Sequence, residues 1–404
     1  MTISAKSSAS TCVIASRAEA LERARALTPQ LRARAAAADR DRAVPAESIR
    51  AINEAGLFRV MAPKAYGGSQ LGLACLIEVA AEIASGCGST GWLFGVLGGH
   101  AWLMGLYPAE TQKEFFDNPR SLAASVVRLL GDRPKRVAGG YAIRNAHGKF
   151  CSGVDHSDWI ILGAGVEGAN GGVDPTYLVV PKSEVEVIDD WHTSGMRGTG
   201  SRSLRIREAF VPDRRGVAIG DMVRGTAPGI AHLDSPAFRL VFPQVLPITL
   251  AGAPLGLGRA GVAAFIDKYR GRLAAMSEEQ MGEQSHFFMR LTEATAEVDA
   301  AYLSVVRLCE EIDAMADGTQ ATPLQRARFL RDISHAAWRC RTAVNSLYEG
   351  SGGSVIYDEE PLQRIWRDMN AAAAHNSFVR ERSATMFGRA LLGLQPSKFD
   401  RIGH

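Results

Sequence analysis

The sequence predicts an α+β protein in which a β domain separates two helical domains. Apolar residues recur at helical spacing before residue 120, and glycine-rich sequence with short β-branched runs follows between 121 and 233. Helical spacing returns at 234 and continues to the end of the chain. We therefore expect an N-terminal α-helical domain over 1–120, a middle β domain over 121–233 and a C-terminal four-helix bundle over 234–404.

The N-terminal domain is predicted to hold four helices. Two stretches rich in Ala, Arg, Glu and Leu, 18–38 and 46–55, precede a break at 63–72 that contains Tyr66-Gly67-Gly68. Two more apolar helices are expected over 73–84 and 90–107, and Pro108 ends the second of them. This half of the domain is apolar enough to be buried.

The middle domain is predicted from its strands. Short β-branched or aromatic runs stand at 141–143, 159–162 and 177–180, and 203–207 alternates polar and apolar residues. Residues 168–172 are suited to a loop between two of these strands. A β-barrel or β-sandwich of about a hundred residues is a typical domain of this kind.

Four long helices are expected in the C-terminal domain. Three apolar stripes run over 262–273, 291–312 and 330–347. The fourth helix begins at Pro361, a residue suited to a first helical turn, and extends to His375. On this helix Arg364, Asp368 and His375 would line one flank of the apolar stripe, where a neutral imidazole can exchange a proton near neutral pH.

Bulk composition excludes several classes of protein. Lys and Arg total 46 against 43 Asp and Glu, and a net charge of +3 does not indicate a nucleic-acid partner. The first 16 residues contain no signal-peptide core, and prolines interrupt the uncharged run 240–258, so we expect a buried segment and no membrane span. Six separated cysteines indicate reduced thiols in a cytoplasmic protein.

Two patterns that suggest binding sites have simpler interpretations. Gly256-Leu257-Gly258-Arg259-Ala260-Gly261 matches GxGxxG, but no strand precedes it and no βαβ unit follows, which favours glycines that allow close helix packing. His147, Cys151 and His156 lack a fourth ligand at zinc-site spacing, so no metal is expected.

Two loops of the middle domain are better candidates. Residues 148–153 place an aromatic ring, a hydroxyl and glycines at a strand end, which suits a planar heterocycle. Residues 191–201 combine glycines, Thr and Ser in a loop whose amides can hold an anion. An ordinary turn or strand connection explains each loop equally well.

Taken together, these features resemble the acyl-CoA dehydrogenase superfamily. The resemblance rests on the helix–β–helix order, on Gly195-Met196-Arg197-Gly198-Thr199-Gly200-Ser201 before Phe210-Val211-Pro212, and on Arg367-Asp368 in the last helix. Within the superfamily, the chain is similar to the two-component flavin-dependent monooxygenases of group D, typified by the oxygenase component of p-hydroxyphenylacetate hydroxylase.

The resemblance implies an enzyme that hydroxylates an indole-like or phenolic aromatic substrate. Reduced FAD or FMN would diffuse from a partner NAD(P)H:flavin reductase, and O2 would add to it as a C4a-hydroperoxyflavin. It also implies catalytic roles for His375, as acid/base, and for Ser152 at flavin N5, with His100, Ser125 and Trp92 at the substrate. The cofactor-binding residues would be Phe150, Ser152, Gly153, Arg197, Thr199, Gly200 and Ser201. The resemblance also implies that the protein is a homotetramer.

The departures from the superfamily pattern bear on the reaction. Straight-chain acyl-CoA dehydrogenases need a carboxylate where this chain has His375, and Tyr348-Glu349-Gly350 comes too early in the sequence to supply it. The Arg-x-x-Phe-Gly pattern for the adenine half of FAD is absent after Tyr269, so FAD and FMN both stay open. An acyl-CoA dehydrogenase, and a non-catalytic helical oligomer that binds a hydrophobic ligand, are the alternatives.

Overall fold

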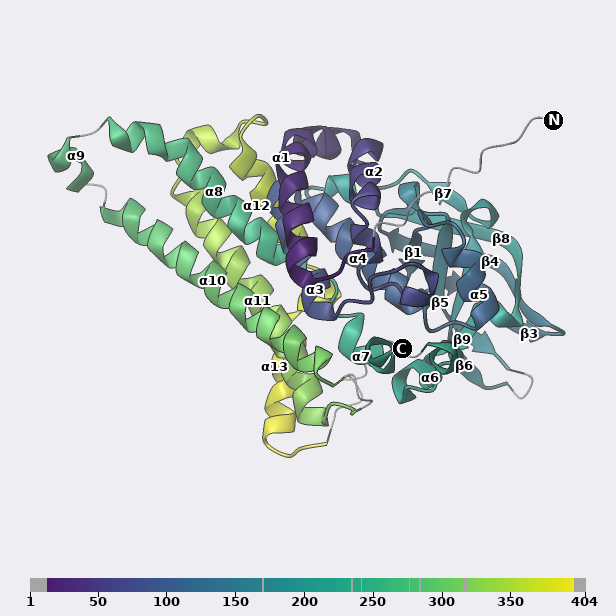
Figure 1. Ribbon diagram of the computed structural model, residues 1–404. Coiled ribbons are helices and arrows are strands. Elements are labelled where there is room, and N and C mark those ends of the chain that lie inside the picture. The colour runs from purple at the N-terminus through teal and green to yellow at the C-terminus, as the bar shows by residue number, and fades with distance from the viewer. Residues whose placement is uncertain are drawn as a thin grey trace.

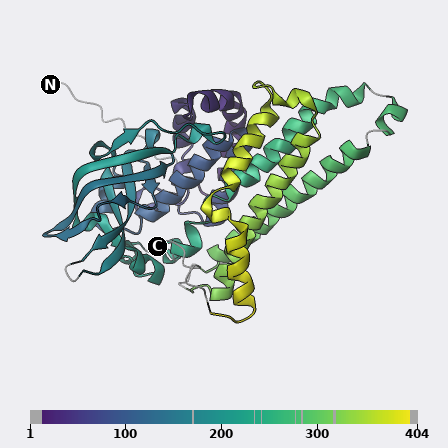
Figure 2. The same cartoon turned by 180° about the vertical axis from the view of Figure 1, so that it is seen from behind.

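The computed structural model describes residues 13–168, 171–233, 235–240, 242–275, 277–282, 285–315 and 319–395. The β-sheet lies at one end of the molecule and the long C-terminal helices lie at the other, with the N-terminal helices between them (Figures 1 and 2). Helix α4 therefore lies between the two other parts of the chain, where it contacts both strand β1 and helix α8.

The N-terminal part contains α1 (Arg17–Asp41), α2 (Ala46–Glu54), α3 (Leu73–Gly86), α4 (Gly88–Met104) and α5 (Ala109–Phe116). The four predicted helices are found, and only α5 was not expected. Nearly all of α4 is buried, and its glycines make the close packing possible. A Cβ atom on Gly95 would lie 2.4 Å from the carbonyl oxygen of Thr249, which only glycine avoids.

The N-terminus of α3 is capped by a residue far along the chain. The Asp313 carboxylate accepts hydrogen bonds from the backbone N–H groups of Leu73 (2.7 Å) and Ala74 (3.0 Å). These N–H groups have no partner inside their own helix, and a carboxylate at this end also matches the helix dipole. The contact ties the N-terminal helices to α10.

The middle part holds one mixed nine-stranded sheet. Its strands are β1 (Ala123–Val126), β2 (Leu130–Gly131), β3 (Lys135–Val137), β4 (Gly140–Cys151), β5 (Trp159–Glu167), β6 (Val173–Pro181), β7 (Glu186–Ile188), β8 (Arg202–Pro212) and β9 (Gly216–Ala218). The order is β7-β8-β4-β3-β5-β6-β9, with β1 parallel to β5 and β2 paired with β4. The four predicted strands lie in β4, β5, β6 and β8. The others, of two to four residues each, are too short to show a period.

The predicted loop at 168–172 joins β5 to β6, although residues 169 and 170 lie outside the described part of the chain. The ladder between β4 and β8 is regular except between Gly148 and Cys151, where the register shifts. A shift of this kind is a β-bulge, which bends the strand and redirects its side chains. It falls inside the first candidate loop.

The C-terminal part contains α6 (Ile219–Arg224), α7 (Phe242–Val245), α8 (Gly252–Ala274), α9 (Glu278–Gly282), α10 (Ser285–Asp313), α11 (Pro323–Glu349), α12 (Pro361–Ala373) and α13 (Arg380–Leu391). Helices α8, α10, α11 and α12 are the four expected ones. Gly256, Gly258 and Gly261 lie on α8, where added Cβ atoms would meet α3, α10 and α11 at 3.0 Å or less. These glycines serve helix packing, as predicted.

One prediction about the last helix is wrong. Helix α12 ends at Ala373, so His375 is not on its flank. His375 instead has extended backbone angles and caps the 3-10 helix Asn376–Phe378, because its side chain accepts a hydrogen bond from the Ser377 N–H. The hydrogen bond between the His375 side chain and the backbone thus replaces further helical backbone hydrogen bonds after the four alanines.

Shorter 3-10 helices connect these elements at Leu57–Arg59, Lys64–Tyr66, Val154–His156, Lys182–Glu184, Arg197–Thr199, Asp213–Arg215, Pro228–His232, Pro236–Arg239 and Gly353–Ile356. The five described cysteines are free and buried, and burial raises the pKa of Cys75 to about 12, which leaves its thiol protonated. Cys12 lies outside the described residues. No helix in the described ranges is long and apolar enough to cross a membrane. Those ranges also contain no group of three or more His, Cys, Asp or Glu residues placed to hold a metal ion.

Candidate active site at the domain junction

The turn before β8 is held against helix α12. The Asp368 carboxylate accepts a 2.6 Å hydrogen bond from the Met196 N–H, and the Arg367 guanidinium donates a 2.9 Å bond to the Ser194 carbonyl. Gly195 lies between them, where a Cβ atom would be 2.2 Å from the carbonyl oxygen of Arg367. Two segments that the sequence marked separately therefore form one contact.

Helix α1 supplies the third part of this contact. Arg367 also binds Asp39 at 2.7 Å, so the last residues of α1, the turn and α12 are joined around one guanidinium. Asp368 is 5% exposed, and this burial raises the pKa of its carboxyl to about 6. No local pattern marks Asp39 in the sequence, because it stands 328 residues from its partner.

A row of hydroxyl groups runs from this turn to helix α4. The Thr199 hydroxyl donates to the Met196 carbonyl (2.8 Å), and its oxygen lies 2.7 Å from the Ser201 hydroxyl. The Ser201 oxygen lies 2.7 Å from that of Ser152, which accepts a 3.3 Å bond from the Trp92 indole N–H. Four residues predicted to bind cofactor or substrate thus form one connected network.

His375 lies against the Trp92 end of this network. The two rings meet edge to face with centroids 5.3 Å apart. Burial lowers the pKa of His375 to about 4, so the imidazole is neutral at physiological pH. Since Nδ1 accepts from the Ser377 N–H, the ring proton is assigned to Nε2, which therefore acts as a hydrogen-bond donor.

Phe150 stands two residues before Ser152 and is largely exposed. It lies in the β4 bulge with a φ of 63°, an unfavourable conformation for a bulky residue, and 69% of its surface is exposed. Its ring contacts Trp191 edge to face at 6.0 Å, and the Trp191 N–H donates to the Met196 carbonyl. An exposed aromatic side chain, held in strained backbone two residues before Ser152, fits a planar ring system such as the isoalloxazine of a flavin.

Three predicted residues lie outside the hydroxyl row. His100 lies two turns along α4 from Trp92 and is 3% exposed, with Nδ1 2.6 Å from the Ala123 carbonyl. Ser125 is half-buried in β1, opposite Ile161 of β5. The Arg197 guanidinium donates to the carbonyls of Asp39 (3.0 Å) and Thr193 (3.1 Å), so it ties the turn to the end of α1.

The remaining predicted glycines fit close backbone contacts. Gly153 donates its N–H to the Thr199 carbonyl at 3.1 Å, which links the β4 loop to the turn. Gly200 has a φ of 51°, and a Cβ atom there would lie 2.7 Å from the Asp155 carboxylate. Gly153 has a φ of 76°, so both positions have the left-handed backbone conformation that favours glycine.

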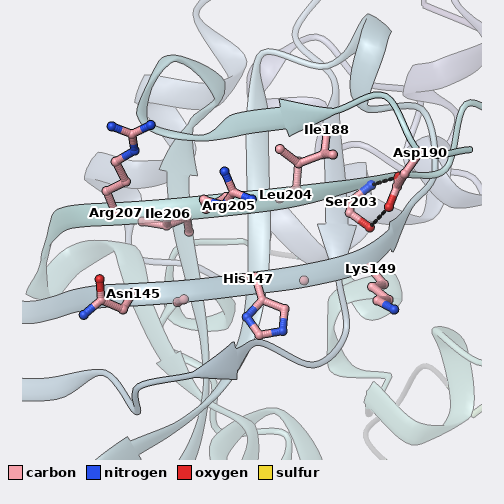
Figure 3. Close-up of a pocket in the computed structure, with 12 residues that line it drawn as sticks. Asn145, His147, Lys149, Ile188, Asp190, Ser203, Leu204, Arg205, Ile206 and Arg207 are labelled. Atoms are coloured by element: carbon pink, nitrogen blue, oxygen red, sulfur yellow. Dashed lines mark hydrogen bonds between the residues drawn. The ribbon is translucent and has the colours of Figure 1, made fainter.

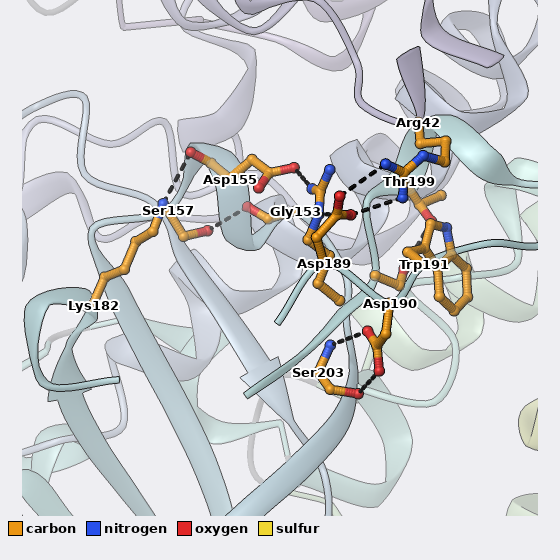
Figure 4. Close-up of polar contacts among 12 residues, drawn as sticks. Arg42, Gly153, Asp155, Ser157, Lys182, Asp189, Asp190, Trp191, Thr199 and Ser203 are labelled. Atoms are coloured by element: carbon orange, nitrogen blue, oxygen red, sulfur yellow. Dashed lines mark hydrogen bonds and ion pairs between the residues drawn. The ribbon is translucent and has the colours of Figure 1, made fainter. Parts of the chain in front are cut away.

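Ion pairs that the sequence did not indicate support the same segment from outside. Arg42 forms two hydrogen bonds with Asp189, at 2.7 and 2.9 Å, and Asp190 accepts from the backbone and side chain of Ser203 (Figure 4). Arg202 joins Asp189 at 3.1 Å. Arg42 stands 147 positions from Asp189, and the other two pairs are each 13 positions apart, so no helical or strand spacing marks these contacts.

Two open surface hollows lie away from this network. One, of about 480 Å³, lies on the outer face of the sheet between β4 and β8, and His147, Lys149 and Arg205 contribute to its lining (Figure 3). The other, of about 600 Å³, is lined by residues 155–158 with Lys182, Ser183 and Val185. None of the predicted site residues lines either hollow, so the candidate site rests on the convergence of Trp92, Ser152 and His375.

Comparison with known proteins agrees with this arrangement. Residues 18–117 match the acyl-CoA dehydrogenase N-terminal domain, and residues 248–380 match the C-terminal domain. The oxygenase subunit HsaA of a flavin-dependent monooxygenase from Mycobacterium tuberculosis is 31% identical over 373 residues, which cover 92% of this chain and 94% of that protein. The chain belongs to the flavin-dependent monooxygenases, as an oxygenase subunit.

Solved structures support the assignment over the whole oxygenase. The crystal structure of 3-HSA hydroxylase from Rhodococcus sp. RHA1 has a TM-score of 0.89 and 29% identity, and covers 95% of this chain and 99% of that one. XiaF from Streptomyces sp., in complex with FADH2 and glycerol, has a TM-score of 0.84 and 30% identity, and covers 94% and 96%. The predicted fold, enzyme class and use of reduced flavin are thus confirmed. An oxygenase subunit of this class depends on a separate flavin reductase.

Proposed function

We propose that this oxygenase hydroxylates an indole-like or phenolic compound where Trp92, Ser152 and His375 meet. The convergence of these three side chains, from α4, the β4 loop and the segment after α12, carries the proposal. Support for the substrate class comes from relatives named FADH2-dependent resorcinol hydroxylase and indole-3-acetate monooxygenase, which are 32% and 28% identical to this chain. The exposed Phe150, two residues before Ser152, would add an apolar surface for a planar ring.

Reduced FAD or FMN supplies the electrons and the oxygen chemistry when bound. Phe150 would contact the flavin ring, and Ser152 would lie at its N5 edge. Thr199, Ser201 and the two glycines would bring backbone and hydroxyl groups close to the cofactor. Arg197 would act indirectly, because its guanidinium is already bonded to backbone carbonyls on both sides.

The two histidines would orient the substrate in complementary ways. The neutral His375 ring carries its proton on Nε2 and would donate to a substrate oxygen, whereas acting as a base would require Nδ1 to release Ser377. His100 is also neutral, since burial lowers its pKa to about 4, and its Nδ1–H is donated to Ala123. Only its Nε2 lone pair is left to accept from a substrate hydroxyl, with Ser125 nearby on β1.

The experiment mixes anaerobic protein and reduced FAD or FMN with isotopically labelled O2 and a panel of phenols and indoles. We expect tight binding of reduced flavin and label in a hydroxylated product. His375→Ala should lose product and form hydrogen peroxide instead, while His335→Ala, a matched change on α11, should behave like wild type. Flavin that oxidises at its free rate, with no binding, would contradict the proposal.

The two alternatives are less consistent with the site. An acyl-CoA dehydrogenase needs a free carboxylate, but the Glu349 side chain is 70% exposed and lies 3.8 Å from Arg290, while Asp368 is bonded to Met196. A non-catalytic ligand-binding oligomer would bind no reduced flavin. We also propose a homotetramer, supported by exposed leucines on the bundle (Leu303, 66%; Leu391, 62%; Leu392, 75%), to be tested by light scattering.

A further inference from the structure

The hydroxyl row between α4 and the turn has a fixed direction. Its two ends are groups with a single role: the Trp92 indole N–H can only donate, and the Met196 carbonyl can only accept. Between them stand three hydroxyls, of Ser152, Ser201 and Thr199, each with one proton to donate. The successive oxygen–oxygen distances of 2.7 Å require one proton in each contact.

Only one assignment of protons satisfies every contact. Thr199 uses its proton on the Met196 carbonyl, so the Ser201 hydroxyl must donate to Thr199. Ser201 then has no proton left, so the Ser152 hydroxyl must donate to Ser201. Ser152 accepts from Trp92 at the far end, which agrees with this direction. The Ser152 oxygen therefore faces any further partner as an acceptor and not as a donor.

The end of the row at Met196 is firmly held. Its N–H donates to buried Asp368, and its carbonyl also accepts from the Trp191 indole. The Thr199 backbone N–H donates to the same carbonyl at 3.1 Å, so three donors converge on it. Together with the charged acceptor on the Met196 N–H, they leave this segment no freedom to turn. The orientation of three hydroxyls thus depends on the contact between the turn and α12.

We propose that Ser201 and Thr199 are positioning residues that make the site select reduced over oxidised flavin, by holding Ser152 as an acceptor. The inference rests on the proposed function, which places Ser152 at flavin N5. Reduced flavin carries a hydrogen on N5 and can donate it to the Ser152 oxygen. Oxidised flavin has only a lone pair at N5, which would face the lone pair of Ser152 with no proton between them.

The size of the effect follows from one hydrogen bond. When a partly buried acceptor forms a hydrogen bond instead of staying unsatisfied, the dissociation constant changes by about tenfold. Removing the acceptor for the Ser152 proton frees it to turn toward flavin N5. Oxidised flavin should then bind about tenfold more tightly, while reduced flavin, which still donates to the same oxygen, should bind nearly as before.

The experiment measures the dissociation constants of FAD and of dithionite-reduced FAD for the full-length protein under anaerobic conditions. Wild type should favour the reduced form, and Ser201→Ala should narrow the ratio of the two constants by about tenfold, mainly through the oxidised form. Thr199→Val should act in the same direction, and Thr199→Ser should restore the wild-type ratio. Ser157→Ala removes a nearby hydroxyl that bonds to the Gly153 carbonyl outside the row, so it should leave the ratio unchanged.

The outcomes separate the two proposals. If neither form of flavin binds wild type, the proposed function fails and the inference fails with it. A second outcome is that wild type binds flavin and circular dichroism shows that Ser201→Ala is folded. If Ser201→Ala and Thr199→Val then keep the wild-type ratio of the two dissociation constants, only the hydroxyl assignment is overturned. A loss of affinity equal for both forms would indicate a merely structural role and would also overturn it.

Discussion

His100 should make the protein sensitive to acid, and His100→Asn should remove that sensitivity. The ring is 3% exposed, and its Nδ1 lies 2.6 Å from the Ala123 carbonyl, so Nδ1–H donates and the ring stays neutral. Asparagine places an amide N–H at the position of Nδ1 and can keep this bond. It cannot take up a proton in the same pH range.

The magnitude follows from the pKa. Burial lowers the pKa of His100 from 6.5 to about 4, so the unfolded chain binds more protons than the folded protein between these two values. Stability is therefore unaffected above about pH 6.5 and falls as the pH drops toward 4. The full loss is about 3 kcal/mol, of which about 2 kcal/mol is expressed at about pH 5.

The assay is urea unfolding of both proteins at about pH 8 and about pH 5, followed by tryptophan fluorescence. From about pH 8 to about pH 5, the free energy of unfolding of wild type should fall by about 2 kcal/mol more than that of His100→Asn. This difference does not depend on how much the substitution destabilises the protein at the higher pH. His375, also with a lowered pKa, and Asp368, with a raised one, are present in both proteins and cancel. An equal acid-induced loss in the two proteins would refute a buried neutral His100.

Other variants test the contacts around the turn and the helix caps. Asp313→Ala should cost about 2 kcal/mol in thermal or urea unfolding, because two N–H groups of α3 lose a charged acceptor, and an unchanged stability would contradict the cap. Asp368→Ala should lower the free energy of unfolding by about 3 kcal/mol, weaken the binding of reduced flavin and speed proteolysis within 191–201. A turn that resists protease as well as in wild type would argue against the anchoring role of Asp368. Gly195→Ala should cost at least about 2 kcal/mol, since its Cβ would meet the Arg367 carbonyl, whereas Gly388→Ala, with nothing within 4 Å in helix α13, should be neutral or stabilising.

The order of the domains was predictable because helical and strand periodicity is a local property. Apolar spacing of three and four residues located the long helices, and alternation located β4, β5, β6 and β8. The missing strand before the GxGxxG pattern led to the prediction that Gly256, Gly258 and Gly261 allow close helix packing, and this prediction was also correct. The short strands, and the end of α12 before His375, were not predictable in this way, because a strand of two to four residues shows no period and the side-chain cap formed by His375 leaves no periodic signal.

The amino-acid sequence alone was enough to show which residue types stand in two loops and near the end of the chain, and their resemblance to a family indicated the enzyme class. The folded structure was needed to show that Met196 is bonded to Asp368, 172 positions away, and that Trp92, Ser152, Ser201 and Thr199 share one row of hydrogen bonds. Hydrogen bonds are directional and short, so their partners depend on how whole domains pack. The direction of each proton in the row was fixed only when both ends were in place.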